Sequence, residues 1–188
     1  MTRKALKRRE FMAGTAVAAV SVTTAPARAG DGPEDFAYEV VRTDDEWRGM
    51  LTDTEYFVLR EFGTEEQRSS PLWNEKRPGT YCCKGCDLTI YRSLHKIELS
   101  KGWAFFRHSY PDTVMTSLDL NGGRMGDPFA EIAAAMEVHC RRCGSHLGHI
   151  VNIPEEVPGK PIHCINGHAL SFPPAEAYTD RSEGLMHQ

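Results

Sequence analysis

The stretch that decides the fold reads Cys-Arg-Arg-Cys-Gly-Ser-His-Leu-Gly-His and covers residues 140–149 of the 188-residue chain. It begins with a Cys-x-x-Cys pair, and a second pair of the same spacing stands at Cys83 and Cys86. Four thiolates in two such pairs are the usual ligands of a structural zinc ion, which they enclose as a closed tetrahedron. The sequence therefore predicts one structural Zn²⁺, bound by Cys83, Cys86, Cys140 and Cys143, rather than two disulfides.

The two cysteine pairs are separated by 53 residues, so the ion is expected to join two distant strand-turns. Gly85 and Gly144 are expected to supply the permissive backbone positions of these turns. Cys82 directly precedes a ligand. Its side chain is expected to point away from the metal, because successive side chains of a strand alternate between the two faces.

Two cysteines, Cys82 and Cys164, remain after the metal ligands are assigned. Cys164 stands between His163 and His168, and a neighbouring imidazolium lowers the pKa of a thiol and so favours the nucleophilic thiolate. Cys164 is therefore the candidate nucleophile. A buried, inert thiol is the alternative that stays open. Cys82, the other free thiol, is the candidate resolving cysteine.

Capping boxes predict two short helices near the start of the domain. Thr43 to Glu46 opens the first, which runs to about Leu51, and Thr52 to Glu55 opens the second, which Gly63 is expected to end. We expect both helices to lie at the periphery and to bury their apolar side chains. These are Trp47, Phe57 and Leu59.

From residue 80 onward, short apolar runs separated by turn residues predict a mainly β fold. A short strand at 38–41 is also expected. The remaining candidate strands are 80–83, 89–91, 104–107, 114–120, 136–139, 147–151, 162–165 and 169–172.

Residues 1–29 have the composition of an export signal: a basic start, a mildly apolar stretch at 11–24 and a small-x-small site ending at Ala29. The consecutive arginines, Arg8 and Arg9, resemble the bacterial twin-arginine signal. An ordinary secretory signal or an uncleaved anchor stays open. The apolar stretch is too short for a stable spanning helix, so we predict a periplasmic or otherwise exported protein without stable membrane insertion.

Removing the leader's net charge of +5 from the total of −4 leaves about −9 for the mature chain. An acidic chain without a basic stripe is a poor binder of nucleic acid, and we predict none as a partner. Residues 30–43 are expected to form a linker and N-terminal segment, 44–174 the zinc domain, and 175–188 a disordered tail.

Five blocks of sequence between residues 57 and 172 form a specific combination. They are Val58-Leu59-Arg60-x-x-Gly63-Thr64-Glu65, Gly79-x-Tyr81-x-Cys83-x-x-Cys86, Gly102-Trp103, the stretch 140–149, and Cys164-Ile165-Asn166-x-x-Ala169-Leu170-x-Phe172. Together they resemble the methionine-R-sulfoxide reductases of the B class. The resemblance implies a β-tent of two small antiparallel sheets, peripheral short helices and a zinc ion at one end.

The resemblance also implies the chemistry. Cys164 would attack the sulfur of a protein-bound methionine-R-sulfoxide and become a sulfenic acid, which a second thiol and a thioredoxin-like reductant would reduce. His146 and His149 would line the pocket, one of them holding or protonating the sulfoxide oxygen. The substrate-binding residues would be Trp103, against the substrate methyl group, with Asn166, Phe172 and His163. The partners implied are oxidised proteins or peptides.

The chain departs from the family pattern around the nucleophile. Ile153 stands in place of an acidic residue, Ile162 in place of an arginine, and Lys101 where some members carry a recycling cysteine. We therefore expect a histidine, His163 or else His149, to supply the positive charge beside the thiolate. Two alternatives to the enzyme stay open: a catalytically weak zinc-stabilised β module that binds a partner or small ligand, and a thiol peroxidase or small-molecule sulfoxide reductase.

Overall fold

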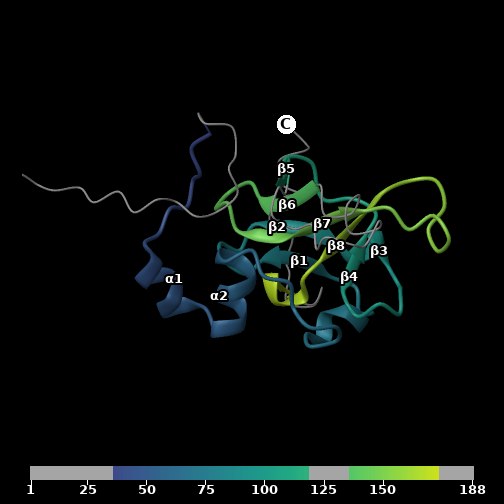
Figure 1. Ribbon diagram of the computed structural model, residues 1–188, viewed down its shortest axis with the longest axis horizontal. Coiled ribbons are helices and arrows are strands. Elements are labelled where there is room, and N and C mark those ends of the chain that lie inside the picture. Colours follow the sequence, from purple (N-terminus) through teal and green to yellow (C-terminus); the bar gives the residue numbers. More distant parts are fainter. Residues whose placement is uncertain (1–35, 119–135, 174–188) are drawn as a thin grey trace, which may run out of the picture.

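The computed structural model of the chain describes residues 36–118 and 136–173, which form two antiparallel sheets with two short helices beside them (Figure 1). The smaller sheet has the strand order β2-β1-β9, and the larger has the order β3-β4-β8-β7-β6-β5. The strands are β1 (Thr80–Cys83), β2 (Thr89–Arg92), β3 (Lys96–Ile97), β4 (Ala104–Phe106), β5 (Val114–Leu118), β6 (Met136–Cys140), β7 (His146–Val151), β8 (Ile162–Ile165) and β9 (Leu170–Ser171). The helices are α1 (Asp44–Met50), α2 (Asp53–Arg60) and the short 3₁₀ turns η1 (Pro71–Asn74), η2 (Ser93–His95) and η3 (Gly167–Ala169). The predicted mainly β fold is confirmed.

Both capping boxes form as predicted. The Thr43 hydroxyl accepts from the Glu46 amide at 3.3 Å, and the Glu46 carboxylate accepts from the Thr43 amide at 2.8 Å. Thr52 and Glu55 repeat the arrangement at 3.3 and 2.9 Å. These bonds satisfy amides that the start of a helix leaves without partners, so local sequence alone sets where both helices begin.

Gly63 closes α2 as predicted, by donating its amide to the Phe57 carbonyl at 3.0 Å, and the residue with left-handed backbone is the preceding Phe62, with φ of 59°. The burial of the helices differs from the prediction at one residue. Phe57 is 46 % exposed rather than buried, while Trp47 and Leu59 are buried as expected. The ring of Phe57 packs on Gly63, where a Cβ would lie 2.3 Å from it.

The predicted strand at 38–41 is wrong, because this segment pairs with no strand among the described residues; the Val40 amide donates instead to the Arg142 carbonyl, in the turn after β6. The predicted role of Gly85 is also wrong. In the first cysteine turn Asp87 takes the left-handed backbone, with φ of 58°, and Gly144 does so in the second, with φ of 68°. Gly85 is small for a different reason. A Cβ at this position would lie 3.0 Å from the Ser145 hydroxyl and 3.2 Å from the Trp47 ring, so there is little room for a side chain.

The apolar side chains form two clusters on opposite faces of the larger sheet. The main core lies between the two sheets and includes Tyr81 and Tyr91 from the smaller sheet and Phe106 and Ile165 from the larger. The second cluster covers the other face of β4 and β8. Its members are Ile97, Leu99, Trp103, Phe105, Val151, Ile153, Val157, Ile162 and Cys164. The candidate nucleophile therefore faces away from the main core.

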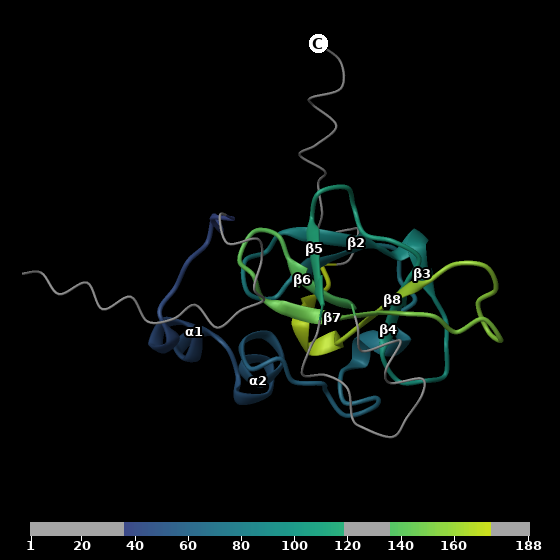
Figure 2. The ribbon, with the colours of Figure 1, turned by 45° about the horizontal axis from the view of Figure 1, so that its top comes forward.

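The helices α1 and α2 lie at one end of the molecule, and the loop 152–161 extends from the opposite end (Figure 2). No helix in the two described ranges is both long and apolar enough to cross a membrane. The predicted export signal, the loop at 121–135 and the tail from 175 lie outside the described residues.

Candidate active site and metal centre

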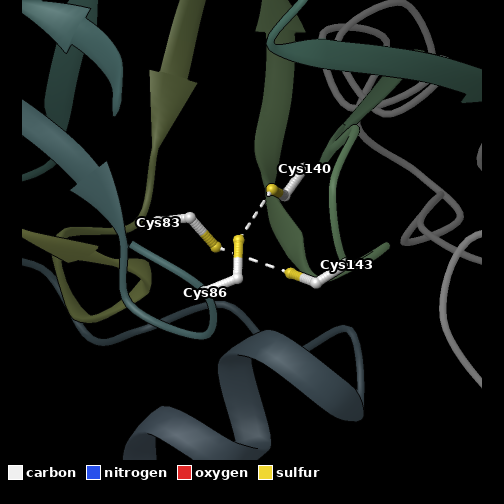
Figure 3. A group of neighbouring side chains, drawn as sticks. All are labelled: Cys83, Cys86, Cys140 and Cys143. Atoms are coloured by element: carbon white, nitrogen blue, oxygen red, sulfur yellow. Dashed lines mark hydrogen bonds between the residues drawn. The ribbon is translucent and has the colours of Figure 1, made fainter. Parts of the chain in front are cut away.

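Four cysteines converge where the turns β1–β2 and β6–β7 meet (Figure 3). Their sulfur atoms all lie within 4.8 Å of one another, at 3.7 Å for Cys83 and Cys143 and 3.6 Å for Cys86 and Cys140. Zinc bonds to sulfur of about 2.3 Å in a tetrahedron place neighbouring sulfurs about 3.8 Å apart, and a disulfide needs about 2.05 Å. All four thiols are free, so the donor set fits one tetrahedral ion and forms no disulfide.

Cys82 lies outside this group of four, on the opposite face of β1 from its neighbour. Its sulfur contacts the Thr89 hydroxyl at 3.5 Å, and the residue is 7 % exposed. Cys82 belongs to the smaller sheet and Cys164 to the larger. No contact between their side chains is present in the described residues, so resolution by Cys82 stays a prediction.

Cys164 occupies the middle of β8, between β4 and β7. Its backbone partners are Phe105 on one side and His149 on the other. The side chain packs in the second cluster beside Trp103 and Ile162. The structure thus brings together three of the residues that the sequence singled out: Cys164, His149 and Trp103.

The electrostatic surroundings of Cys164 oppose ionisation. Burial, and secondarily the charge of Glu65, raise the pKa of the Cys164 thiol to about 12, while the charge of Lys101 acts in the other direction. Lys101 is also held by an ion pair, with its Nζ 2.6 Å from the Glu156 carboxylate. The thiol is therefore protonated at neutral pH, and Lys101 is a cation that favours its thiolate.

A buried carboxylate ties down the turn that follows the nucleophile. Glu65 accepts hydrogen bonds from the amides of Gly167 and His168, both at 2.8 Å. Its own amide donates to the Asn166 side chain at 3.0 Å, and its carbonyl accepts from the Trp103 indole at 3.3 Å. Burial raises the pKa of Glu65 although both amide bonds lower it. Asn166 and Trp103 are thus fixed relative to Cys164 through one segment.

His146 is almost completely buried, and its two ring nitrogens have different surroundings. Nδ1 donates to the Glu137 carboxylate at 2.7 Å, whereas Nε2 has no hydrogen-bond partner among the described residues. The His146 ring lies edge-to-face with His149, with ring centres 5.2 Å apart. His149 is the backbone partner of Cys164 in the sheet, so the His149 ring lies between the His146 ring and the strand of the candidate nucleophile.

His163 and Phe172 lie apart from the Cys164 side chain. His163 points to the other face of β8, where its Nδ1 is 3.0 Å from the Tyr91 hydroxyl. Burial, with a contribution from the charge of His108, lowers the pKa of His163 to about 4. It is neutral at physiological pH, so the expectation that its imidazolium stabilises the Cys164 thiolate is wrong. Phe172 packs on Tyr81, with ring centres 4.7 Å apart, in the main core.

Three charged residues of the site were given no role from the sequence: Glu65, Lys101 and Glu137. Glu65 had a detectable signal, because it ends one of the five blocks. Glu137 had a weaker signal, because it is an acidic residue inside the predicted strand 136–139. The ion pair of Lys101 with Glu156 spans two loops and has no local signal.

Gly148 lets β7 approach β8 at the nucleophile. A Cβ here would lie 2.1 Å from the Cys164 carbonyl oxygen and 2.9 Å from the Ile165 Cα, and neither backbone atom can yield without moving β8. We expect Gly148→Ala to lower the free energy of unfolding by about 1–3 kcal/mol or more, as overpacking does. Urea unfolding measures this. Gly49→Ala is the control, since nothing lies within 4 Å of its Cβ position in α1, and an equal loss in both variants would contradict the argument.

Comparison with known protein families finds one domain. Residues 51–174 match the SelR domain, which covers most of the part of the chain that the structure describes.

Several curated proteins are similar to the chain over most of their own length. Peptide methionine sulfoxide reductase MsrB of Leifsonia xyli subsp. xyli is 34 % identical over 140 residues, which are 74 % of this chain and 94 % of that protein. MsrB of Agrobacterium fabrum is 34 % identical over 138 residues, 72 % of this chain and 94 % of that protein. Peptide methionine sulfoxide reductase B3 of Arabidopsis thaliana is 31 % identical and covers 72 % of each chain.

Proposed function

Since this chain belongs to the SelR-domain family of MsrB peptide methionine sulfoxide reductases, we propose that it reduces protein-bound methionine-R-sulfoxide with Cys164 as the nucleophile. The resemblance seen in the sequence is confirmed, and the chain is an oxidoreductase of the peptide-methionine (R)-S-oxide reductase class. One observation carries the choice of nucleophile. Cys164 stands opposite His149 in the sheet and beside Trp103 in an apolar cluster, whereas the other thiols form the metal group or lie in the smaller sheet.

The proposed reaction transfers one oxygen atom. The Cys164 sulfur attacks the sulfoxide sulfur, the sulfoxide oxygen takes up a proton, and the oxygen passes to Cys164 as a sulfenic acid. The substrate sulfur gains the two electrons that the cysteine sulfur gives up. The proton lost by the thiol balances the one that the oxygen takes up. A second thiol then forms a disulfide with Cys164 and releases water; Cys82 or a thioredoxin-like protein supplies it.

The cluster around Cys164 supports an apolar substrate group. Trp103 and Phe105 contribute aromatic surface, and Ile153 and Ile162 add aliphatic surface where the family pattern has charges. We assign the substrate methyl group to the Trp103 ring. Asn166 shapes the site indirectly, because its amide also donates to the Leu147 carbonyl at 3.1 Å.

Lys101 is the cation to test for activation of the thiol. Replacing Lys101 by Met removes the charge that lowers the Cys164 pKa, so the pKa is expected to rise by up to about one unit. Because alkylation needs the thiolate, its rate at pH 8 should fall by up to about tenfold. Rates of iodoacetamide labelling against pH measure the effect.

Two controls accompany that measurement. Lys160→Met removes an exposed lysine elsewhere in the chain, and His163→Ala removes the neighbouring imidazole on the other face of β8. Both profiles should coincide with the wild-type profile. A Lys101→Met profile that also coincides, or a shift in His163→Ala alone, would contradict the assignment.

Turnover of the two sulfoxide epimers tests the proposed function. With dithiothreitol as reductant, a peptide containing methionine-R-sulfoxide should be reduced and the S epimer left unchanged. The apolar replacements Ile153 and Ile162 favour one second candidate, a zinc-stabilised module that binds ligands without turning them over. Binding of the R-sulfoxide peptide without reduction would support that candidate and reject the enzyme.

We also propose a resident metal and a cellular setting. The four-cysteine group holds one Zn²⁺, whose closed set of thiolates leaves no position for substrate and makes its role structural. The leader at 1–29 directs export by the twin-arginine route to the periplasm, where the domain at 44–174 repairs oxidised exported proteins.

A further inference from the structure

A buried acid–imidazole pair lies next to the nucleophilic strand and has no role in the proposal above. Glu137 of β6 and His146 of β7 are 5 % and 1 % exposed and share a hydrogen bond of 2.7 Å. The other Glu137 oxygen accepts from the Ser117 hydroxyl of β5 at 3.2 Å. Three adjacent strands therefore hold the carboxylate and the ring in one geometry.

This geometry determines where the imidazole carries its proton. A carboxylate only accepts, so the proton shared with Glu137 resides on Nδ1 of His146. Nε2 is left buried without a partner among the described residues. Both ring nitrogens of the buried His139 also lack partners among the described residues, so what distinguishes His146 is its hydrogen bond to Glu137.

The His146 ring packs against two other rings. The ring of His149 is edge-to-face with it at 5.2 Å between ring centres, and His149 is the backbone partner of Cys164. The Phe62 ring lies at 5.9 Å between ring centres, and Phe62 has a left-handed backbone, which is unusual for a bulky residue.

The cluster around Cys164 is mainly apolar. Ile153 and Ile162 are apolar, and Lys101 is engaged with Glu156. The Glu65 carboxyl, whose charge acts on Cys164, is held by the amides of Gly167 and His168. Sulfoxide reduction requires a proton on the leaving oxygen, and the placement of His149 opposite Cys164 therefore matters for the reaction.

We propose that Glu137 is a positioning residue of sulfoxide reduction: it holds His146, whose ring packs edge-to-face on His149 and so sets where the His149 ring lies beside Cys164. This inference rests on the proposed function and extends it to a buried acid–imidazole pair that does not itself touch the substrate.

The charges around the Glu137–His146 pair agree with this role. Although burial raises the pKa of Glu137, the hydrogen bond from His146 is chief among the opposing contacts that hold it below its usual value, so the carboxylate is ionised at neutral pH. The other titratable groups near His146 are His139 on β6, His149 on β7, Tyr38 near the second cysteine turn, and Arg60, which donates to the Ser145 hydroxyl.

Glu137→Gln tests the proposal, because the amide keeps the shape and the acceptor but removes the charge. We expect kcat to fall by tenfold or more with KM nearly unchanged. The kcat–pH profile should also change, which a loss of stability alone would not produce. Zinc content and the rate of Cys164 alkylation should stay at wild-type values, which separates positioning from a structural defect.

Further measurements keep the test decisive. Glu98→Gln, which breaks an exposed ion pair with Lys76, is the matched control and should leave both kcat and its pH profile unchanged. Ser117→Ala, which leaves the charge in place, should give a smaller loss in the same direction. Nitrogen-15 NMR of the wild-type ring should show the proton on Nδ1 of His146, a result that does not depend on any variant folding.

The outcomes distinguish this inference from the proposed function. If Cys164→Ser retains activity, the proposed function fails. Suppose instead that Cys164→Ser is inactive. If Glu137→Gln then keeps the wild-type kcat and pH profile, or if His146 Nδ1 carries no proton, Cys164 remains the nucleophile and the positioning role of Glu137 is rejected.

Discussion

Replacing Cys164 by serine is expected to abolish reduction of methionine-R-sulfoxide. An alcohol is a far weaker nucleophile than a thiolate and cannot accept the oxygen as a sulfenic acid, so kcat should fall by at least about 1,000-fold, the scale on which loss of a nucleophile acts. Serine has nearly the same shape, and Cys164 is not fully buried, so the fold should persist. Zinc content and thermal unfolding measured on the same sample would establish this.

Cys82→Ser is the matched control for that experiment, since it replaces the other thiol outside the metal group. With dithiothreitol it should turn over at the wild-type rate. With a thioredoxin-like reductant a lower rate would identify Cys82 as the resolving thiol. Substantial activity in Cys164→Ser would show that the nucleophile is misassigned.

Replacing Cys143 by serine is expected to prevent stable folding. The metal group joins the β1–β2 turn of the smaller sheet to the β6–β7 turn of the larger one, so losing a ligand loosens the contact between the sheets. Structural zinc contributes about 10–16 kcal/mol to the folding of zinc-finger peptides, whereas whole domains are stable by about 5–15 kcal/mol. Metal analysis and circular dichroism on heating, with and without a chelator, measure the effect.

The Cys82→Ser control should bind one zinc per chain and unfold at a temperature close to that of the wild type. Two results would contradict the metal centre. One is a wild-type protein that contains no zinc and two disulfides, and the other is a Cys143→Ser protein whose unfolding matches the wild type.

Local patterns predicted most of the secondary structure. The two helix starts follow from capping boxes whose bonds join residues three apart, so four consecutive residues contain the whole interaction. The strand predicted at 38–41 failed for the opposite reason. A strand exists only when another strand pairs with it, and the segment meets the turn at Arg142 instead. The left-handed residue after α2 is Phe62 rather than the neighbouring glycine, and its ring packs near His146, about 80 positions away along the chain.

The candidate site likewise contains residues that the sequence identified and residues that only the fold could place. Residue types and their order identified Cys164, His146 and His149, because few residue types can serve as nucleophile or proton carrier. The face toward which His163 points depended on strand alternation, which sends Cys164 and His163 to opposite sides of β8. Glu65, which binds amides about 100 positions away along the chain, could be placed only by the fold.

By itself the sequence determined the helix starts, the four cysteines that could hold a metal and the candidate nucleophile, since each depends on the chemistry of a few residues close together in the chain. Only the tertiary structure decided the ionisation of those groups. The pKa values of Cys164, His163 and Glu137 are set by how much water the surrounding strands exclude and which charges lie nearby. Desolvation depends on every segment that packs against a group, and those segments are far apart until the chain has folded.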